Sequence, residues 1–239
     1  MPRFFTDKID DKIALISGDD AKHISKVLRY KLGDKLTVCD GNGNDYDCEI
    51  ISIENDITLK ILNKCHSVSE PSVKIKLYQA LPKLDKFEFI IQKSVELGVG
   101  EIIPIMTNRC ISRPTEDKMK HKHERYITIA RQAAKQSGRG LIPKVKPLMQ
   151  FEDAIYEAAK AESAVMFYEG GGAPISSLIS ENIKELSIII GSEGGFGEDE
   201  VEFARKKGIN TATLGPRILR CETAPLAAIS IIMNLTGNM

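Results

Sequence analysis

The chain has 239 residues, 42% of them hydrophobic, and its 33 basic and 33 acidic side chains give a formal net charge of zero. No apolar run approaches the roughly 20 residues of a membrane-spanning helix, and the first seven residues lack the apolar stretch of a secretory signal. Five cysteines, without CxxC spacing, favour neither a disulfide framework nor a zinc site. We therefore expect a cytoplasmic protein with reduced thiols, a sizeable core and no metal ion.

The first 70 residues have the pattern of a small β-rich domain. Strand-like runs at 35–38 and 46–52 are joined by residues 40–45, whose Gly and Asn residues favour a tight connection. An alternating strand follows at 57–61.

A short helix capped by Asp19 or Asp20 is expected before these strands. The spacing places Ile24, Val27 and Leu28 on one face, and a second face carries the cations Lys22, Lys26 and Arg29. The cations are either the solvated side of an amphipathic helix or, with the nearby His23 and Arg3, a surface that contacts RNA.

Residues 67–72 are polar and contain Pro71, so we expect a domain boundary there, with one domain over 1–70 and a second over 73–239. Beyond the boundary, strand-like and helical patterns alternate. Such alternation predicts an α/β fold with a mainly parallel sheet covered on both faces.

A basic segment lies in the middle of the chain. Residues 107–146 hold eleven Lys or Arg against three acids, whereas residues 151–239 hold seven against thirteen. In a helix expected over 124–136, Arg131, Lys135 and, if the helix continues, Arg139 recur at intervals of four. The segment is either a nucleic-acid surface or a solvated helix with a basic bias.

Three apolar strands near the C-terminus are followed by small residues. Residues 164–167 lead to Glu169-Gly-Gly-Gly, 188–190 lead to Gly191-Ser-Glu-Gly-Gly-Phe, and 213–214 lead to Gly215-Pro-Arg. Ligands bind at the carboxyl ends of strands in open α/β sheets, so one shared small-molecule pocket is expected. The loops match neither the P-loop nor the GxGxxG pattern, which disfavours triphosphate chemistry.

The C-terminal motifs resemble the bacterial small-subunit (16S) ribosomal RNA uracil-N3 methyltransferases of the SPOUT superfamily. The resemblance rests on 191–196, 214–220 and 222–224, and it extends through motifs in order along almost the whole chain: 3–5, 23–29, 83–99, 136–139 and 142–143. It implies a PUA-like β-barrel followed by an α/β domain with a C-terminal trefoil knot. It also implies S-adenosylmethionine as the cofactor, a homodimer, and small-subunit ribosomal RNA or the assembled subunit as the substrate.

The resemblance, the charge pattern and the chemistry of N3 methylation together suggest candidate residues for three roles. The resemblance implies cofactor contacts from the three strand ends: Phe167, Tyr168, Glu169, Gly191, Glu193, Gly194, Gly195, Leu214, Gly215, Leu219, Cys221 and Thr223. The catalytic candidates are Arg217 and Arg220, to neutralise the uracil oxygens or a neighbouring phosphate, and Glu222 or Glu193, to accept the N3 proton or orient a water. An Arg220–Glu222 ion pair inside the loop is the alternative. The RNA-binding candidates are Arg3, Lys22, His23, Lys26, Arg29, Arg109, Arg131, Lys135 and Arg139.

Four positions depart from the pattern of these enzymes, which usually carry Pro at the place of Ser192 and Thr at the place of Cys221. His and Glu are expected where Lys22 and Lys135 stand. These departures leave a second hypothesis open, namely an RNA-binding ribosome-assembly factor without turnover. A Rossmann-type enzyme of small-molecule metabolism is a third, but its glycine loop would follow the first strand.

Overall fold

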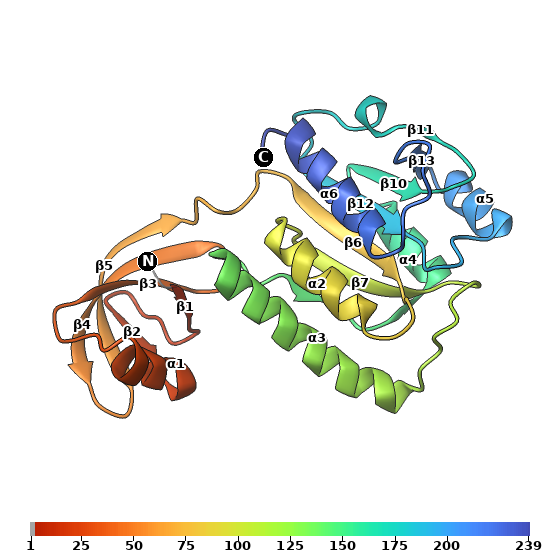
Figure 1. Ribbon diagram of the computed structural model, residues 1–239. Coiled ribbons are helices and arrows are strands. Elements are labelled where there is room, and N and C mark those ends of the chain that lie inside the picture. The colour runs from red at the N-terminus through yellow and green to blue at the C-terminus, as the bar shows by residue number, and fades with distance from the viewer. Residues whose placement is uncertain (1–2) are drawn as a thin grey trace. The chain divides into compact units, whose positions relative to one another are not determined.

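The computed structural model describes residues 3–239 and divides into two compact units (Figure 1). The first unit comprises the residues up to Glu70 together with Ala134–Ile142, and the second comprises Pro71–Ala133 and Pro143–Met239. Residues 134–142 therefore group with the first unit, and the predicted boundary at residues 67–72 does not separate them from it.

The first unit is built on a five-stranded sheet of order β1-β3-β4-β5-β2. Its strands are β1 (Arg3–Phe5), β2 (Ile13–Ile16), β3 (Lys35–Cys39), β4 (Asn44–Ile53) and β5 (Ile57–His66). β1 is parallel to β3 and the other pairs are antiparallel. Alternate residues such as Leu36 and Val38 enter the core, as expected for strands with one buried face.

A short helix, α1 (Gly18–Lys22), continues into one π-helical turn, η1 (His23–Val27). In this wider turn the Leu28 N–H donates to the His23 carbonyl at 2.9 Å. The side chains that follow therefore point in a different direction around the helix axis than they would in a continuous α-helix. Ile24 is buried, but Val27 and Leu28 are 67% and 37% exposed. The prediction that all three share an apolar face is therefore wrong for Val27 and Leu28.

The second unit contains an eight-stranded sheet of order β11-β13-β10-β12-β6-β7-β8, with β9 beside β7. Its strands are β6 (Lys74–Ala80), β7 (Glu101–Met106), β8 (Lys144–Val145), β9 (Met149–Gln150), β10 (Ser163–Phe167), β11 (Ala173–Pro174), β12 (Glu185–Ile190) and β13 (Asn210–Thr213). Every strand pair is parallel. The predicted α/β fold with a mainly parallel sheet is confirmed.

Helices cover this sheet (Figure 1). α2 (Lys86–Glu96) contacts α6 (Thr223–Leu235), and α6 also contacts β6. α4 (Phe151–Ala158) contacts β6 and β7, while α5 (Glu198–Lys206) contacts β13; a short 3₁₀ turn, η2, spans Ile175–Ser177. Because the central strands are covered, Ile188, Ile189 and Ile190 are at most 2% exposed.

The long helix α3 (Glu116–Ser137) starts eight residues before the position expected from sequence. Its residue Tyr126 packs against Phe87 of α2, with ring centroids 4.9 Å apart. The helix ends at Ser137 and is followed by Gly138, whose φ of +74° suits a residue beyond a helix C-terminus. Within residues 3–239, no helix is long and apolar enough to span a membrane.

Candidate active site

A cavity of about 660 Å³ opens where β10, β12 and β13 end, and its volume lies within the range of small-molecule sites. In the strand register Phe167 is opposite both Ile190 and Ala212, so the three strands end at one level. The carboxyl ends of parallel strands therefore form the walls of one pocket, as the sequence predicts.

The first wall is the loop after β12. The Gly195 N–H donates to the Ser192 carbonyl at 3.0 Å, and Gly195 has a φ of +65°, in the region that favours glycine. A Cβ atom at Gly195 would overlap the Glu169 carboxylate. The buried Gln79 amide donates to the Gly191 carbonyl at 3.1 Å, and Arg109 donates to the Gly194 carbonyl at 3.1 Å. This wall is thus a compact turn, held by side chains from β6 and from the segment after β7.

The second wall is the segment after β13. The Gly215 N–H donates to Thr213 Oγ1 at 3.2 Å, and Gly215 has a φ of +99°. Arg217 and Arg220 are exposed and line the cavity. The Arg220 carbonyl accepts the N–H groups of Thr223 and Ala224 at 2.8 and 2.9 Å, so the first turn of α6 fixes the end of this segment.

A charged cluster joins these walls to the start of α2. Lys86 Nζ lies 3.0 Å from a Glu193 oxygen and 3.2 Å from a Glu222 oxygen. The Glu193 carboxylate also accepts the Lys83 N–H at 3.2 and 3.3 Å, while the Cys221 thiol donates to Glu222 at 3.2 Å. Glu222 is therefore paired with Lys86, in place of the Arg220 partner considered from sequence.

These contacts shift the pKa values of the cluster. Hydrogen bonds to Glu193 and then to Glu222 raise the pKa of Lys86. Burial opposes ionisation of both carboxylates, but their hydrogen bonds, including those from Lys86, outweigh it and lower the pKa of each. Burial, followed by the bond to Glu222, raises the pKa of Cys221 to about 12, so this thiol is neutral at physiological pH.

Most residues predicted to bind the cofactor lie on this cavity. All line it except Thr223, and the catalytic candidates Arg217 and Arg220 line it as well. Glu222 is not part of the lining but pairs with Lys86, which is. Sequence reasoning missed Lys86, which lines the cavity from the start of α2. Its position in the sequence could have indicated this role, because residues 81–86 follow the carboxyl end of β6, the strand next to β12 in the sheet.

The predicted RNA-binding residues separate by exposure. Lys22, Lys26, Arg29, Arg109 and Arg131 are exposed. The others have partners inside the first unit: His23 packs edge-on against Phe4, Lys135 pairs with Asp20, and Arg3 binds Asp45 at 3.0 Å and Ser67 at 3.0 Å.

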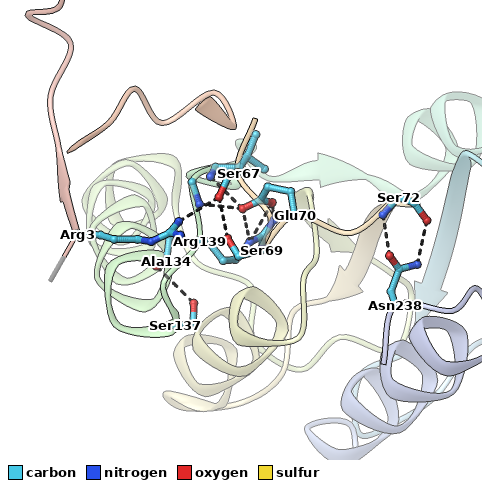
Figure 2. Close-up of polar contacts among 11 residues, drawn as sticks. Arg3, Ser67, Ser69, Glu70, Ser72, Ala134, Ser137, Arg139 and Asn238 are labelled. Atoms are coloured by element: carbon cyan, nitrogen blue, oxygen red, sulfur yellow. Dashed lines mark hydrogen bonds and ion pairs between the residues drawn. The ribbon is translucent and has the colours of Figure 1, made fainter. Parts of the chain in front are cut away.

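Arg139 requires a correction (Figure 2). Since α3 ends at Ser137, Arg139 does not continue the row formed by Arg131 and Lys135. Its side chain is 3% exposed and bonds to Glu70 at 2.6 Å. The second Glu70 oxygen accepts the N–H groups of Gly140 and Leu141 at 2.9 and 3.1 Å. Arg139 is thus an interior residue, and the prediction that it contacts RNA is wrong.

No group of three or more His, Cys, Asp or Glu side chains in residues 3–239 is arranged to hold a metal ion.

Comparison with known families identifies both parts of the chain. An RNA methyltransferase domain family matches residues 69–233, and an RNA methyltransferase PUA domain family matches residues 16–62. A PUA domain joined to a parallel α/β domain, with a pocket at its strand ends, defines the chain as an RNA methyltransferase.

Curated relatives show to which family of RNA methyltransferases the chain belongs. The ribosomal RNA small subunit methyltransferase E of Bacillus subtilis is 36% identical over 225 residues, covering 91% of this chain and 88% of the relative. The enzyme of that name from Buchnera aphidicola of Acyrthosiphon pisum is 31% identical and covers 100% and 95%. The chain belongs to the ribosomal RNA small subunit methyltransferase E family.

Solved structures agree with this placement. The ribosomal RNA small subunit methyltransferase E of Neisseria gonorrhoeae, crystallised with S-adenosyl methionine, superposes with a TM-score of 0.85 at 29% identity. The match covers 98% of each chain. The fold described above is therefore shared over nearly the full length of both proteins.

Proposed function

We propose that this protein transfers the methyl group of S-adenosylmethionine to N3 of a uridine in small-subunit (16S) ribosomal RNA. The observation that carries the proposal is the cavity at the ends of β10, β12 and β13, in a chain of this methyltransferase family. The cavity has the volume, the glycine turns and the mixed lining that an adenine, a ribose and a charged amino-acid tail require.

The residues of the three strand ends are the proposed cofactor contacts. Leu214 and Leu219 offer apolar surface to a flat base, and Glu169 and Glu193 offer carboxylates to hydroxyl or ammonium groups. The turns at Gly191–Gly195 and Gly215 let the main chain approach a ligand closely. When bound, S-adenosylmethionine supplies an electrophilic methyl group on a sulfonium.

The residues of this chain have to make N3 nucleophilic and align it. Uracil N3 is a weak nucleophile while it holds its proton, so negative charge develops on the ring oxygens as that proton leaves. Arg217 and Arg220 are exposed cations on the cavity wall and are the proposed donors to those oxygens. Glu193 and Glu222, already ionised and bonded to Lys86, are better suited to orient groups than to accept the proton.

The RNA has to present an unpaired base, because N3 of a paired uracil is hidden in its base pair. We propose that Lys22, Lys26 and Arg29 of the first unit contact RNA phosphates, and that Arg109 and Arg131 of the second unit are also phosphate contacts, because all five cations are exposed. The match of residues 16–62 to a PUA domain of RNA methyltransferases supports this role for the first unit.

We also propose a cytoplasmic homodimer with a trefoil knot near its C-terminus. Ile218 lines the cavity yet is 86% exposed, which suits a side chain that a second subunit covers.

The chain passes from β12 to the far side of β10 to form β13, and it then returns through 214–222 to α6, which contacts β6. Such a crossing and return is the path that a knot requires.

Mass spectrometry of small-subunit RNA nucleosides tests the reaction. A strain that lacks the gene should lose 3-methyluridine, and the wild-type gene should restore it. In vitro, the purified protein should transfer labelled methyl from S-adenosylmethionine to that RNA. Tight RNA binding without methyl transfer would instead identify an assembly factor, and unchanged 3-methyluridine in the deletion strain would contradict the proposal.

A further inference from the structure

The Lys86 ammonium is a point where three separate chain segments meet. Lys86 is the first residue of α2, Glu193 belongs to the loop after β12, and Glu222 directly precedes α6. Both carboxylates place an oxygen within 3.2 Å of the same Nζ atom. The three side chains are 31%, 27% and 20% exposed, so the cluster is partly withdrawn from water.

The loop before α2 adds a second connection to the same carboxylate. The Lys83 N–H donates to both Glu193 oxygens, and the next residue, Leu84, has a φ of +57° and is 82% exposed. An exposed leucine in a left-handed conformation costs free energy and persists only where its surroundings fix the backbone. The contacts of Lys83 and Lys86 with Glu193 are such fixed points on either side of it.

We propose that Lys86 is a positioning residue of the methyltransferase pocket: it holds the Glu193 and Glu222 carboxylates together, and with them the two loops that form the cofactor walls. Lys86 does this by offsetting the repulsion between two like charges that share one site. This role rests on the proposed function, since it concerns the same cavity.

Removal of this cation leaves two carboxylates close together without a counterion. Like charges at short range favour proton uptake by one member of the pair, so its pKa rises. The other titratable group in contact with the cluster is Cys221, whose pKa of about 12 keeps it neutral between pH 5.5 and 8. Loss of Lys86 therefore adds a carboxylate titration at this cluster, where the pKa values of both wild-type carboxylates are lowered.

The test measures the affinity for S-adenosylmethionine by calorimetry from pH 5.5 to 8. The variants are Lys86→Met, Lys86→Arg and the double variant Lys86→Met/Glu222→Gln. Lys206→Met is the matched control, because Lys206 also pairs with a glutamate, Glu202 at 2.8 Å, but lies outside the cavity lining. The ligand titrates equally in every sample, so the affinity ratio of variant to wild type is the quantity compared.

In Lys86→Met the ratio should rise by at least about fivefold from pH 8 to pH 5.5, because protonation of one carboxylate removes the repulsion that Lys86 offsets in the wild type. Lys86→Arg and Lys206→Met should keep a constant ratio. The double variant has a single carboxylate left and should lose most of the pH dependence. A merely structural role would lower the affinity of Lys86→Met equally at every pH.

A pH-independent ratio for Lys86→Met, or an unchanged pH dependence in the double variant, overturns the positioning role. These results differ from failure of the proposed function, in which the wild-type protein itself does not bind S-adenosylmethionine. Thermal unfolding of each variant identifies any that is not folded. If Lys86→Met is among them, recovery of folding in the double variant supports the positioning role, and a double variant that is equally unfolded overturns it.

Discussion

Two clusters of acidic and basic side chains in this protein have similar chemistry and opposite surroundings. In the first unit, Arg139 and Glu70 are 3% and 10% exposed, and both Glu70 oxygens have several donors (Figure 2). In the second unit, Lys86 bridges Glu193 and Glu222 with side chains 20–31% exposed, beside a cavity. The charged groups of the first cluster already have hydrogen-bond partners within the protein, whereas the second cluster lies where a ligand can reach it.

The comparison shows that exposure, rather than residue type, separates the structural cations from the functional candidates. Arg139 and Arg131 are both arginines of the basic segment, but α3 ends between them. Removing one partner of a buried ion pair lowers the stability of the fold strongly, because the remaining charge is buried with neither a counterion nor water around it. A partly exposed pair at a pocket should instead affect ligand binding more than folding.

The largest expected effect comes from breaking the buried pair. Arg139→Met should lower the free energy of unfolding by about 3–5 kcal/mol, since it leaves the Glu70 carboxylate buried without its cation. Urea denaturation followed by circular dichroism measures this loss. Lys206→Met, which removes an exposed ion pair on α5, should change it by less than about 1 kcal/mol. Equal losses for the two variants would refute the distinction between buried and exposed pairs.

The next effect concerns the first wall of the cavity. Gly195→Ala adds a Cβ that overlaps the Glu169 carboxylate and occupies a φ of +65°, so the turn has to move. We expect the affinity for S-adenosylmethionine to fall by about tenfold, the consequence of roughly 1.4 kcal/mol of distortion.

Gly208→Ala is the matched control for backbone strain. Gly208 has a φ of +82°, but no atom lies within 4 Å of the added Cβ and it is not part of the cavity lining. Both variants should lose stability, and only Gly195→Ala should lose affinity in calorimetry. The same affinity for both would mean that the turn does not contact the ligand.

Much of this site follows from the sequence because strand ends have a local signature. An apolar run followed by glycine marks a buried strand and the turn after it, as at Ile190-Gly191 and Leu214-Gly215. The parallel sheet then brings the turns to one edge without further information. For this reason the position of the cavity was predictable from the residue pattern, whereas the individual candidates came from the family resemblance and left out Lys86, Pro216 and Ile218.

The partners of charged side chains were not predictable in the same way. Glu70 and Arg139 are 69 positions apart, and Lys86 and Glu222 are farther apart still, so no periodicity or spacing relates them. The π-helical turn at His23–Val27 is a similar case, because its single additional residue changes which apolar side chains face the core. The resemblance to a known family supplied the substrate, which the physical patterns do not encode.

A smaller effect is expected for an exposed cation of α3. Arg131→Ala should weaken binding to small-subunit RNA a few-fold and lower the slope of log K against log salt by about 0.7–0.9, the value for one phosphate contact. Affinity for the cofactor and stability should not change. Filter binding across a salt series measures the slope, with Lys206→Met as the control. An unchanged slope would remove Arg131 from the RNA surface.

The smallest effect concerns the loop before α2. Leu84→Gly removes the strain of a left-handed leucine, about 1–2 kcal/mol, but adds flexibility to the unfolded chain that costs about half as much. The net result should be a gain of roughly 0.5 kcal/mol in the free energy of unfolding, seen as a small rise in the urea midpoint. A loss of stability would show that the exposed Leu84 side chain contributes contacts that outweigh its backbone strain.

A crystal structure of the protein grown with S-adenosylhomocysteine tests the central claim most directly. We expect the ligand in the cavity at the ends of β10, β12 and β13, between the Gly191–Gly195 turn and the segment 214–221. Electron density for the ligand at another place, with this cavity empty, would contradict this claim.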